Sequence, residues 1–194
     1  MNQKVDPKRA MLLVMDYQNG IVNRIPNVEA MIARMAKAIA QARRAGLAVG
    51  YVRVALTDDE AAAVPPANTS FSSLKDNRAL RADAPETYIV DQLQPQPDDI
   101  VVRKRRIGAF STTDLHKQLQ ARGITTLILA GFSTSGVVLS TVRDAADKDY
   151  RLFVIEDLTA DGDPEVHATL MQKVFPRQAQ VITADTLAGL LHAA

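Results

Sequence analysis

The segment TLILAGFSTSGVVLSTVRDA, residues 126–145, carries the pattern on which the predicted fold depends. Residues 126–130 form a short apolar run typical of a buried strand, and Gly131 ends it before a loop of small and hydroxyl-bearing residues. A helix is predicted to begin near Gly136, so the segment is a strand, a tight loop and a helix. The backbone N–H groups of such a loop are candidates for an anion or oxyanion site.

Five further apolar runs of strand length occur along the chain, with segments of helical period between them. These runs are Met11–Met15, Leu47–Val54, Ile100–Val102, Leu152–Ile155 and Gln180–Ile182. Strands that alternate with helices favour a parallel sheet with helices on both faces and right-handed crossovers. The predicted fold class is therefore α/β, a three-layer α/β/α sandwich with a six-stranded, mainly parallel, Rossmann-like sheet. No internal boundary is evident, so residues 1–194 are predicted to form a single domain.

Three intervening segments have the features of amphipathic helices. The first has apolar residues at i, i+3 and i+4 spacing from Val28 to Ala42, with Asn27 placed as its cap and Gly46 at its end. The other two are bounded by start and stop signals, which are Ser111 and Gly123 for one helix and Asp163, Pro164 and Pro176 for the other.

The composition excludes several classes of function. Hydrophobic residues make up 47% and charged residues 23% of the chain, which is enough apolar surface for a sizeable core. A net charge of +1 offers no field that would attract nucleic acid or a membrane surface. The absence of cysteine excludes disulfides, thiolate metal sites and a thiol nucleophile. The polar N-terminal residues have no apolar run behind them, so a cytoplasmic location is expected.

Polar residues follow several of the predicted strands, at the edge where open parallel sheets bind ligands. The run MLLVMD ends in Asp16, DIVVRK ends in Lys104, and LFVIED ends in Glu156 and Asp157. An Asp and a Lys that meet at this edge form a charge pair, in which the lysine holds the carboxylate ionised or positions it as a proton carrier. The alternative is that each strand-end Asp only caps a turn or the next helix.

The chain resembles the isochorismatase-like cysteine hydrolase family over residues from about Met11 to Leu187. The resemblance rests on the DYQNG motif at residues 16–20, on Lys104 ahead of Ala109 and Phe110, and on Gly131, Thr134, Ser140, Thr141, Asp144 and Ala145. It implies a catalytic set of Asp16, Lys104 and a cysteine, but the cysteine position holds Val137. Valine can neither attack a carbonyl nor form a thioester, so the chain resembles a member that lacks the catalytic cysteine.

Residues around this pair are predicted to bind the substrate. They are Tyr17, Gln18, Asn68, Phe71, Phe110, Ser133, Thr134 and Gly136, with Arg78 as a further polar candidate. For each aromatic residue the alternative is a place in the core. The segment 57–73 is longer than most connections in a compact domain and is predicted to be functional surface. The resemblance also implies a non-proline cis peptide near Phe132–Ser133.

Metal and cofactor binding are not expected. The nicotinamidase branch of the family has an Asp-x-His zinc site after the second strand, and the corresponding stretch YVRVALTDDE contains no histidine. His116 and His167 fall on predicted helices away from the strand ends, where a structural role is favoured. Hydrogen bonding or helix capping is likewise favoured for the hydroxyls of residues 133–135, because their loop contains no histidine base.

Neighbouring residues leave a strand on opposite faces, so Lys104 is expected to face the site, with Arg103 or Arg105 directed elsewhere.

Two functions from different classes remain open. In the first, implied by the resemblance to isochorismatases, Asp16 protonates the vinyl carbon of an enolpyruvyl ether with Lys104 as its partner, and water then adds. This requires a protonated Asp16, which burial favours and the charge of Lys104 opposes. In the second, the protein is a catalytically inactive member that binds a small ligand or acts through its oligomer. In both, the expected partners are a small molecule and a second copy of the chain, in a dimer or higher homo-oligomer.

Overall fold

One six-stranded sheet forms the centre of the computed structural model, which describes residues 4–74 and 76–191. The strand order is β3-β2-β1-β4-β5-β6, and every neighbouring pair is parallel. The strands are β1 (Ala10–Met15), β2 (Ala48–Val54), β3 (Ile100–Lys104), β4 (Thr126–Gly131), β5 (Arg151–Ile155) and β6 (Gln180–Ile182). All six predicted strands are confirmed, and the sheet is parallel throughout.

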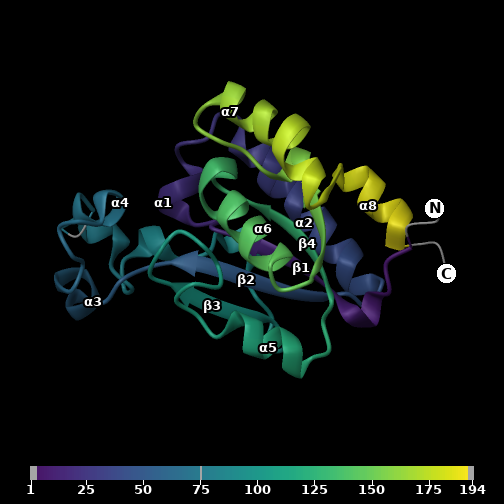
Figure 1. The fold of residues 1–194 in the computed structure, drawn as a ribbon, viewed down its shortest axis with the longest axis horizontal. Helices are drawn as coiled ribbons and strands as arrows, with labels where there is room; N and C mark the ends of the chain where they lie inside the picture. The colour runs from purple at the N-terminus through teal and green to yellow at the C-terminus, as the bar shows by residue number, and fades with distance from the viewer. Residues whose placement is uncertain (1–3, 75, 192–194) are drawn as a thin grey trace.

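Helices cover both faces of this sheet, as the three-layer prediction requires (Figure 1). They are α1 (Asn19–Val22), α2 (Val28–Arg44), α3 (Asp58–Ala62), α4 (Thr69–Ser72), α5 (Leu115–Ala121), α6 (Leu139–Ala146), α7 (Pro164–Thr169) and α8 (Ala184–Leu191). Successive residues of β1 point to opposite faces, so Leu12 joins the core with α2 and α8, whereas Leu13 joins the core with α5 and α6. The sheet is thus buried on both sides.

The helix boundaries follow most of the predicted signals. Asp163 caps α7 by accepting hydrogen bonds from the backbone N–H groups of Glu165 and Val166, and Pro164 is the first helical residue. Past α7 the chain continues through a π turn, Leu170–Val174, and a 3-10 turn, Phe175–Arg177, that includes Pro176. Gly46 and Gly123 adopt positive φ angles of 78° and 66° after α2 and α5, as expected for residues that end helices.

One predicted helix start and one predicted capping contact are wrong. The helix α2 begins at Val28, directly after Asn27 as predicted, but Asn27 is left-handed with φ 54° and its side chain makes no capping hydrogen bond. The second helix begins at Leu115 instead of Ser111, because residues 111–114 form a turn in which the Ser111 hydroxyl donates to the carbonyl of Gly108. Hydroxyl groups that bond to nearby backbone compete with helix formation, which a pattern of apolar residues does not reveal.

The strand order reverses between β1 and β4. From β1 the sheet grows through β2 and β3 on one side and through β4, β5 and β6 on the other. Met15 pairs with Gly131 at this point, and a Cβ atom on residue 131 would lie only 2.5 Å from the Met15 carbonyl oxygen. A glycine is therefore needed to bring the loop after β4 against the end of β1, where open parallel sheets bind ligands.

The long segment 57–73 contains two short helices, α3 and α4, and is not an irregular loop. Figure 1 shows both helices projecting beyond the carboxyl end of β2, at the left of the view, on the same side as α1. Within residues 4–74 and 76–191, no helix has the length and apolar character needed to cross a membrane. Residues 1–3, 75 and 192–194 of the predicted single domain lie outside the described residues.

Candidate active site

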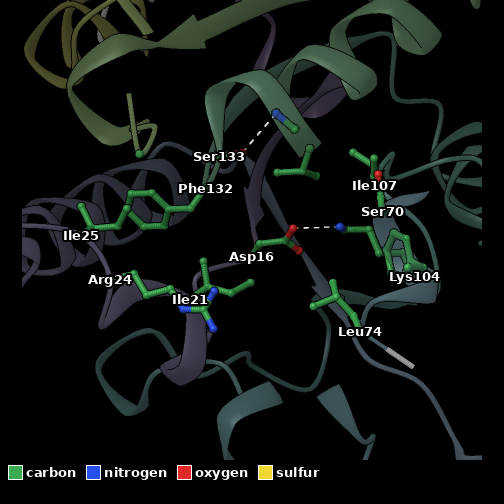
Figure 2. Close-up of a pocket in the computed structure, with 14 residues that line it drawn as sticks. Asp16, Ile21, Arg24, Ile25, Ser70, Leu74, Lys104, Ile107, Phe132 and Ser133 are labelled. Atoms are coloured by element: carbon green, nitrogen blue, oxygen red, sulfur yellow. Dashed lines mark hydrogen bonds and ion pairs between the residues drawn. The ribbon is translucent and has the colours of Figure 1, made fainter. Parts of the chain in front are cut away.

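The side chains of Asp16 and Lys104 meet at the carboxyl edge of the sheet. Asp16 follows β1 and Lys104 ends β3, and the two side chains reach each other past the end of the intervening strand β2. Asp16 Oδ2 lies 2.8 Å from Lys104 Nζ, and the side chains are only 5% and 3% exposed (Figure 2). Lys104 Nζ also donates to the Arg106 carbonyl at 3.3 Å. The structure thus brings together Asp16 and Lys104, the two strand-end residues that were predicted to form a charge pair.

Asp16 is held in a strained backbone conformation. Its φ angle is 57°, in the left-handed region, and its N–H donates to the carbonyl of Val52 at 2.8 Å. Such conformations cost free energy and persist where the surrounding structure fixes them, commonly at functional sites. In this conformation the Asp16 side chain reaches Lys104.

The second carboxylate oxygen of Asp16 is buried without a hydrogen-bond partner in the described part of the chain. Burial raises the pKa of Asp16 above its ordinary value of 3.8, although the charge and the hydrogen bond of Lys104 act in the opposite direction. A buried carboxyl oxygen without a partner is costly unless it carries a proton or meets a ligand. Asp16 therefore has one oxygen held by Lys104 and one available for chemistry.

This oxygen belongs to a residue that lines a cavity of about 390 Å³. Seven of the lining side chains are apolar, and they are Ile21, Ile25, Phe71, Leu74, Ile107, Phe132 and Val137. The polar side chains in the lining are Asp16, Arg24, Ser70, Lys104 and Ser133, and Gly136 and Gly162 complete the wall. A cavity of this size and character holds a small molecule whose body is largely apolar.

The loop after β4 contributes an apolar side chain where the resemblance implies a thiol. Val137 lines the cavity and is 2% exposed. It belongs to a π turn, Thr134–Val138, that leads into α6 and begins two residues before the predicted start at Gly136. The cis peptide bond implied at Phe132–Ser133 is present. The loop thus has the backbone expected from the resemblance, with no nucleophile at position 137.

Three N–H groups of this loop have partners inside the protein. Thr134 N–H donates to the Ala160 carbonyl at 2.9 Å and Ser135 N–H to the Asp161 carboxylate at 2.7 Å. Gly136 N–H donates to the Ser133 hydroxyl at 3.2 Å, so Ser133 caps the turn. An anion site built from these three groups is therefore not supported.

His167 supports the same loop from α7. Its Nδ1 lies 2.8 Å from the hydroxyl oxygen of Thr134, which is fully buried and does not line the cavity. The prediction that this histidine lies away from the strand ends is thus wrong, because α7 packs against the loop after β4. His116 does lie elsewhere, with its Nδ1 3.0 Å from the Tyr150 hydroxyl.

Three of the predicted substrate-binding residues line the cavity. They are Phe71 from α4, Ser133 and Gly136, the last two from the loop after β4. Thr134 instead faces His167. Phe110 packs in the core against Tyr150, with ring centroids 6.1 Å apart.

The remaining predicted residues do not line the main cavity. Tyr17 lies behind Phe132, with ring centroids 4.5 Å apart, and its hydroxyl donates to the Leu158 carbonyl. Gln18 bonds through its amide to the backbone of Val54 and Thr87, so its polar atoms are occupied. Asn68 caps α4 and borders a neighbouring cavity of about 350 Å³, and Arg78 begins a 3-10 turn.

The arginines on either side of Lys104 are directed away from it. Arg103 and Arg105 both lie close to Glu60 of α3, with nitrogen–oxygen distances of 2.5 Å and 3.8 Å. Asp157, another strand-end residue, is used structurally, because it binds Arg34 and accepts from the N–H of Ala184. Lys104 is therefore the cation of the run 103–106 that reaches the cavity.

Arg24 is the main residue of the site that sequence reasoning missed. It follows α1, in a turn with no strand before it, so it is not among the polar residues that end strands. Ile21, Ile25, Leu74 and Ile107 were missed for the same reason, since they reach the cavity from turns and short helices. No group of three or more metal-ligating residues occurs within the part of the chain that the structure describes.

Comparison with known proteins agrees with this architecture. A family model described as Isochorismatase domain matches residues 10–186. The chain belongs to the isochorismatase family. This membership places it among hydrolases that act on small molecules.

Two curated members of the family and one solved structure illustrate the similarity. Ureidoacrylate amidohydrolase RutB of Methylobacterium radiotolerans is 34% identical over 182 residues, with 83% of this chain and 70% of the relative covered. Phenazine biosynthesis protein PhzD1 of Pseudomonas aeruginosa is 33% identical over 186 residues, with 93% and 86% covered. An isochorismatase family protein from Burkholderia thailandensis has a TM-score of 0.82 at 29% identity, with 98% of each chain covered.

Proposed function

We propose that this protein hydrolyses a vinyl ether of the isochorismate type by acid catalysis, without a covalent intermediate. Asp16 is the acid and Lys104 is its partner. The observation that supports this proposal is the buried Asp16 oxygen, which has no hydrogen-bond partner among the described residues and belongs to a carboxyl group whose pKa is raised by burial. Burial disfavours the charged form of this carboxyl group, and a carboxyl group in such a setting is suited to donate a proton to carbon.

The reaction balances with water as the only co-reactant. Asp16 transfers its proton to the terminal CH₂ carbon of the enol ether, and the adjacent carbon becomes an oxocarbenium centre. Water adds to that centre and returns a proton to the Asp16 carboxylate. The hemiketal then breaks its bond to the ether oxygen, which leaves as the alcohol, and the other product is pyruvate. Lys104 stabilises the carboxylate during the interval in which the proton is on the substrate.

This chain cannot use a thiol nucleophile, which is the chemistry that the family resemblance implies. RutB is named an amidohydrolase, but position 137 here is valine and the chain contains no cysteine. The hydroxyls of Ser133 and Thr134 are engaged in capping the loop and in contact with His167. Acid catalysis by Asp16 needs none of these groups.

Val137 favours one competing function, in which the protein binds a small ligand without transforming it. A valine wall adds apolar surface to the cavity and nothing reactive. Against this alternative, a buried ion pair with an unpartnered oxygen is a costly feature for a protein that only binds. The two functions differ in one observable, which is turnover.

The decisive experiment measures pyruvate release from isochorismate and a small panel of vinyl ethers. We expect turnover by the wild type and a loss of kcat by about 10²–10⁴-fold in Asp16→Asn, the range in which a positioned general acid contributes. Glu60→Gln makes the same carboxyl-to-amide change at an ion pair outside the cavity, and it should retain full activity.

Circular dichroism shows whether each variant is folded. Full activity in a folded Asp16→Asn protein would refute the acid role. No release from any vinyl ether, combined with a ligand carried through purification of the wild type, would favour the binding function.

A further inference from the structure

The cavity contains three charged side chains, and two of them neutralise each other. Asp16 and Lys104 form the buried ion pair at 2.8 Å. The third is Arg24, which is exposed to solvent and lines the same cavity. Figure 2 shows its side chain extending beside Ile21 toward the same space that Asp16 and Lys104 border.

Arg24 has no carboxylate partner within 4.0 Å among the residues that the structure describes. The other arginines near this edge have partners that hold them: Arg103 binds Glu60, and Arg106 bonds to the Arg105 carbonyl and lies over the Phe71 ring. Arg24 also borders a second cavity of about 220 Å³, whose acidic lining residue is Glu86. Its guanidinium is thus a cation that borders two cavities and can pair with a ligand.

The remaining walls restrict the body of that ligand. Leu74 and Ile107 are large apolar residues with exposed fractions of 36% and 40%, and both line the main cavity. Phe71, Phe132 and Val137 continue the apolar surface inward. Apolar surface that remains exposed at a cavity entrance is typical of a ligand-binding groove.

We propose that Arg24 is the anion-recognition residue of this site, and that it selects small acids whose carboxylate pairs with its guanidinium while an apolar body fills the cavity. An arginine suits this role because its planar fork binds a carboxylate through two parallel hydrogen bonds. Held in this way, the ligand presents its other end to the unpartnered Asp16 oxygen. The inference rests on the proposed function for the identity of the reacting group, but its binding claim is independent of turnover.

Calorimetric titration with benzoate and benzamide tests the claim. The two probes share an apolar ring and nearly the same shape, and only benzoate carries a negative charge at neutral pH. We expect the wild type to bind benzoate at millimolar concentration, and Arg24→Gln to weaken that binding by about 10–100-fold, as expected for loss of a charged hydrogen bond. Binding of benzamide should be the same in both proteins.

Arg44→Gln is the matched control, because it removes the same charge from an exposed residue at the end of α2, outside the cavities that Arg24 borders. It should bind benzoate as the wild type does. Equal loss in both variants would indicate a general charge effect and overturn the assignment, as would a failure of the wild type to bind benzoate.

The same proteins separate this inference from the proposed function. One outcome is that benzoate binding depends on Arg24 but no vinyl ether releases pyruvate. This outcome would support anion recognition by Arg24 and refute the proposed reaction. Turnover of a vinyl ether with an unchanged KM in Arg24→Gln, together with unchanged benzoate binding, leaves the reaction standing and removes the role of Arg24.

Discussion

Two adjacent residues of β3, Arg103 and Lys104, each bind a carboxylate, and the two pairs lie in opposite environments. Arg103 and Glu60 form their pair near the surface, with side chains that are 32% and 20% exposed. Lys104 and Asp16 form theirs in the interior, with side chains that are 3% and 5% exposed. The alternation of side chains along a strand separates the pairs, because successive residues leave opposite faces.

The carboxyl groups of the two pairs differ in their hydrogen bonds and in the direction in which their pKa is shifted. Both oxygens of Glu60 accept hydrogen bonds from Arg103, and one also accepts from the N–H of Thr57. These hydrogen bonds, led by those of Arg103, lower the pKa of Glu60 to about 2. Asp16 has only one oxygen bonded, and burial raises its pKa. A fully bonded carboxylate serves the structure, whereas a desolvated one with an unpartnered oxygen can carry a proton to a ligand.

The largest expected difference between the pairs is in stability. Asp16→Asn leaves Lys104 buried without its counter-ion, which should reduce the free energy of unfolding by about 3–5 kcal/mol. The double variant Asp16→Asn/Lys104→Met removes the charge as well and should recover most of that loss. Urea unfolding of the three proteins measures both changes. An Asp16→Asn protein as stable as the wild type would show that the pair is hydrated in solution.

The Asp16 and Lys104 pair was predictable because it depends only on topology. Buried strands are visible as apolar runs, parallel strands end at one edge, and the polar residues that end these strands must lie there. Arg24 and His167 were not predictable in this way. Arg24 reaches the cavity because a short turn follows α1, and His167 reaches Thr134 because α7 packs against the loop after β4. Both positions depend on how separate segments of the chain pack against each other. The sequence of one segment contains no pattern that predicts this packing.

The predicted substrate contacts of Tyr17 and Gln18 also depend on packing, and neither residue lines the main cavity. Tyr17 was predicted as an aromatic wall of the cavity, and Gln18 belongs to the DYQNG motif on which the family resemblance rests. In the structure Gln18 instead bonds to β2 and to the turn at Thr87, which fixes the chain after β1. Backbone groups that lose their strand partners must find others, and a buried amide side chain fulfils that need.

The second expected difference is in the pH dependence of catalysis. If protonated Asp16 is the acid, kcat/KM falls by about tenfold for each pH unit above its raised pKa. Lys104→Met removes both influences by which Lys104 lowers that pKa, so the falling limb should move to higher pH. Glu60→Gln should leave the profile unchanged. A profile that rises with pH would instead indicate that ionised Asp16 acts as a base.

The smallest expected difference concerns stability in acid, and it has opposite signs for the two carboxyl groups. The pKa of Glu60 is lowered from 4.5 to about 2, so its contribution is present above pH 4.5 and is lost as the pH falls toward 2. The wild type should therefore be about 1 kcal/mol more stable than Glu60→Gln at pH 6, and this margin should vanish near pH 2. Urea unfolding at several pH values measures the margin.

For Asp16 the folded-state pKa is raised above 3.8, so the unfolded chain releases its proton first as the pH rises. The wild type should therefore lose stability relative to Asp16→Asn/Lys104→Met as the pH increases from about 3.8. The double variant is the suitable reference because neither of its replaced residues titrates. Margins that change in the same direction for both carboxyl groups would mean that Asp16 is an ordinary paired carboxylate, and the distinction between the two pairs would fail.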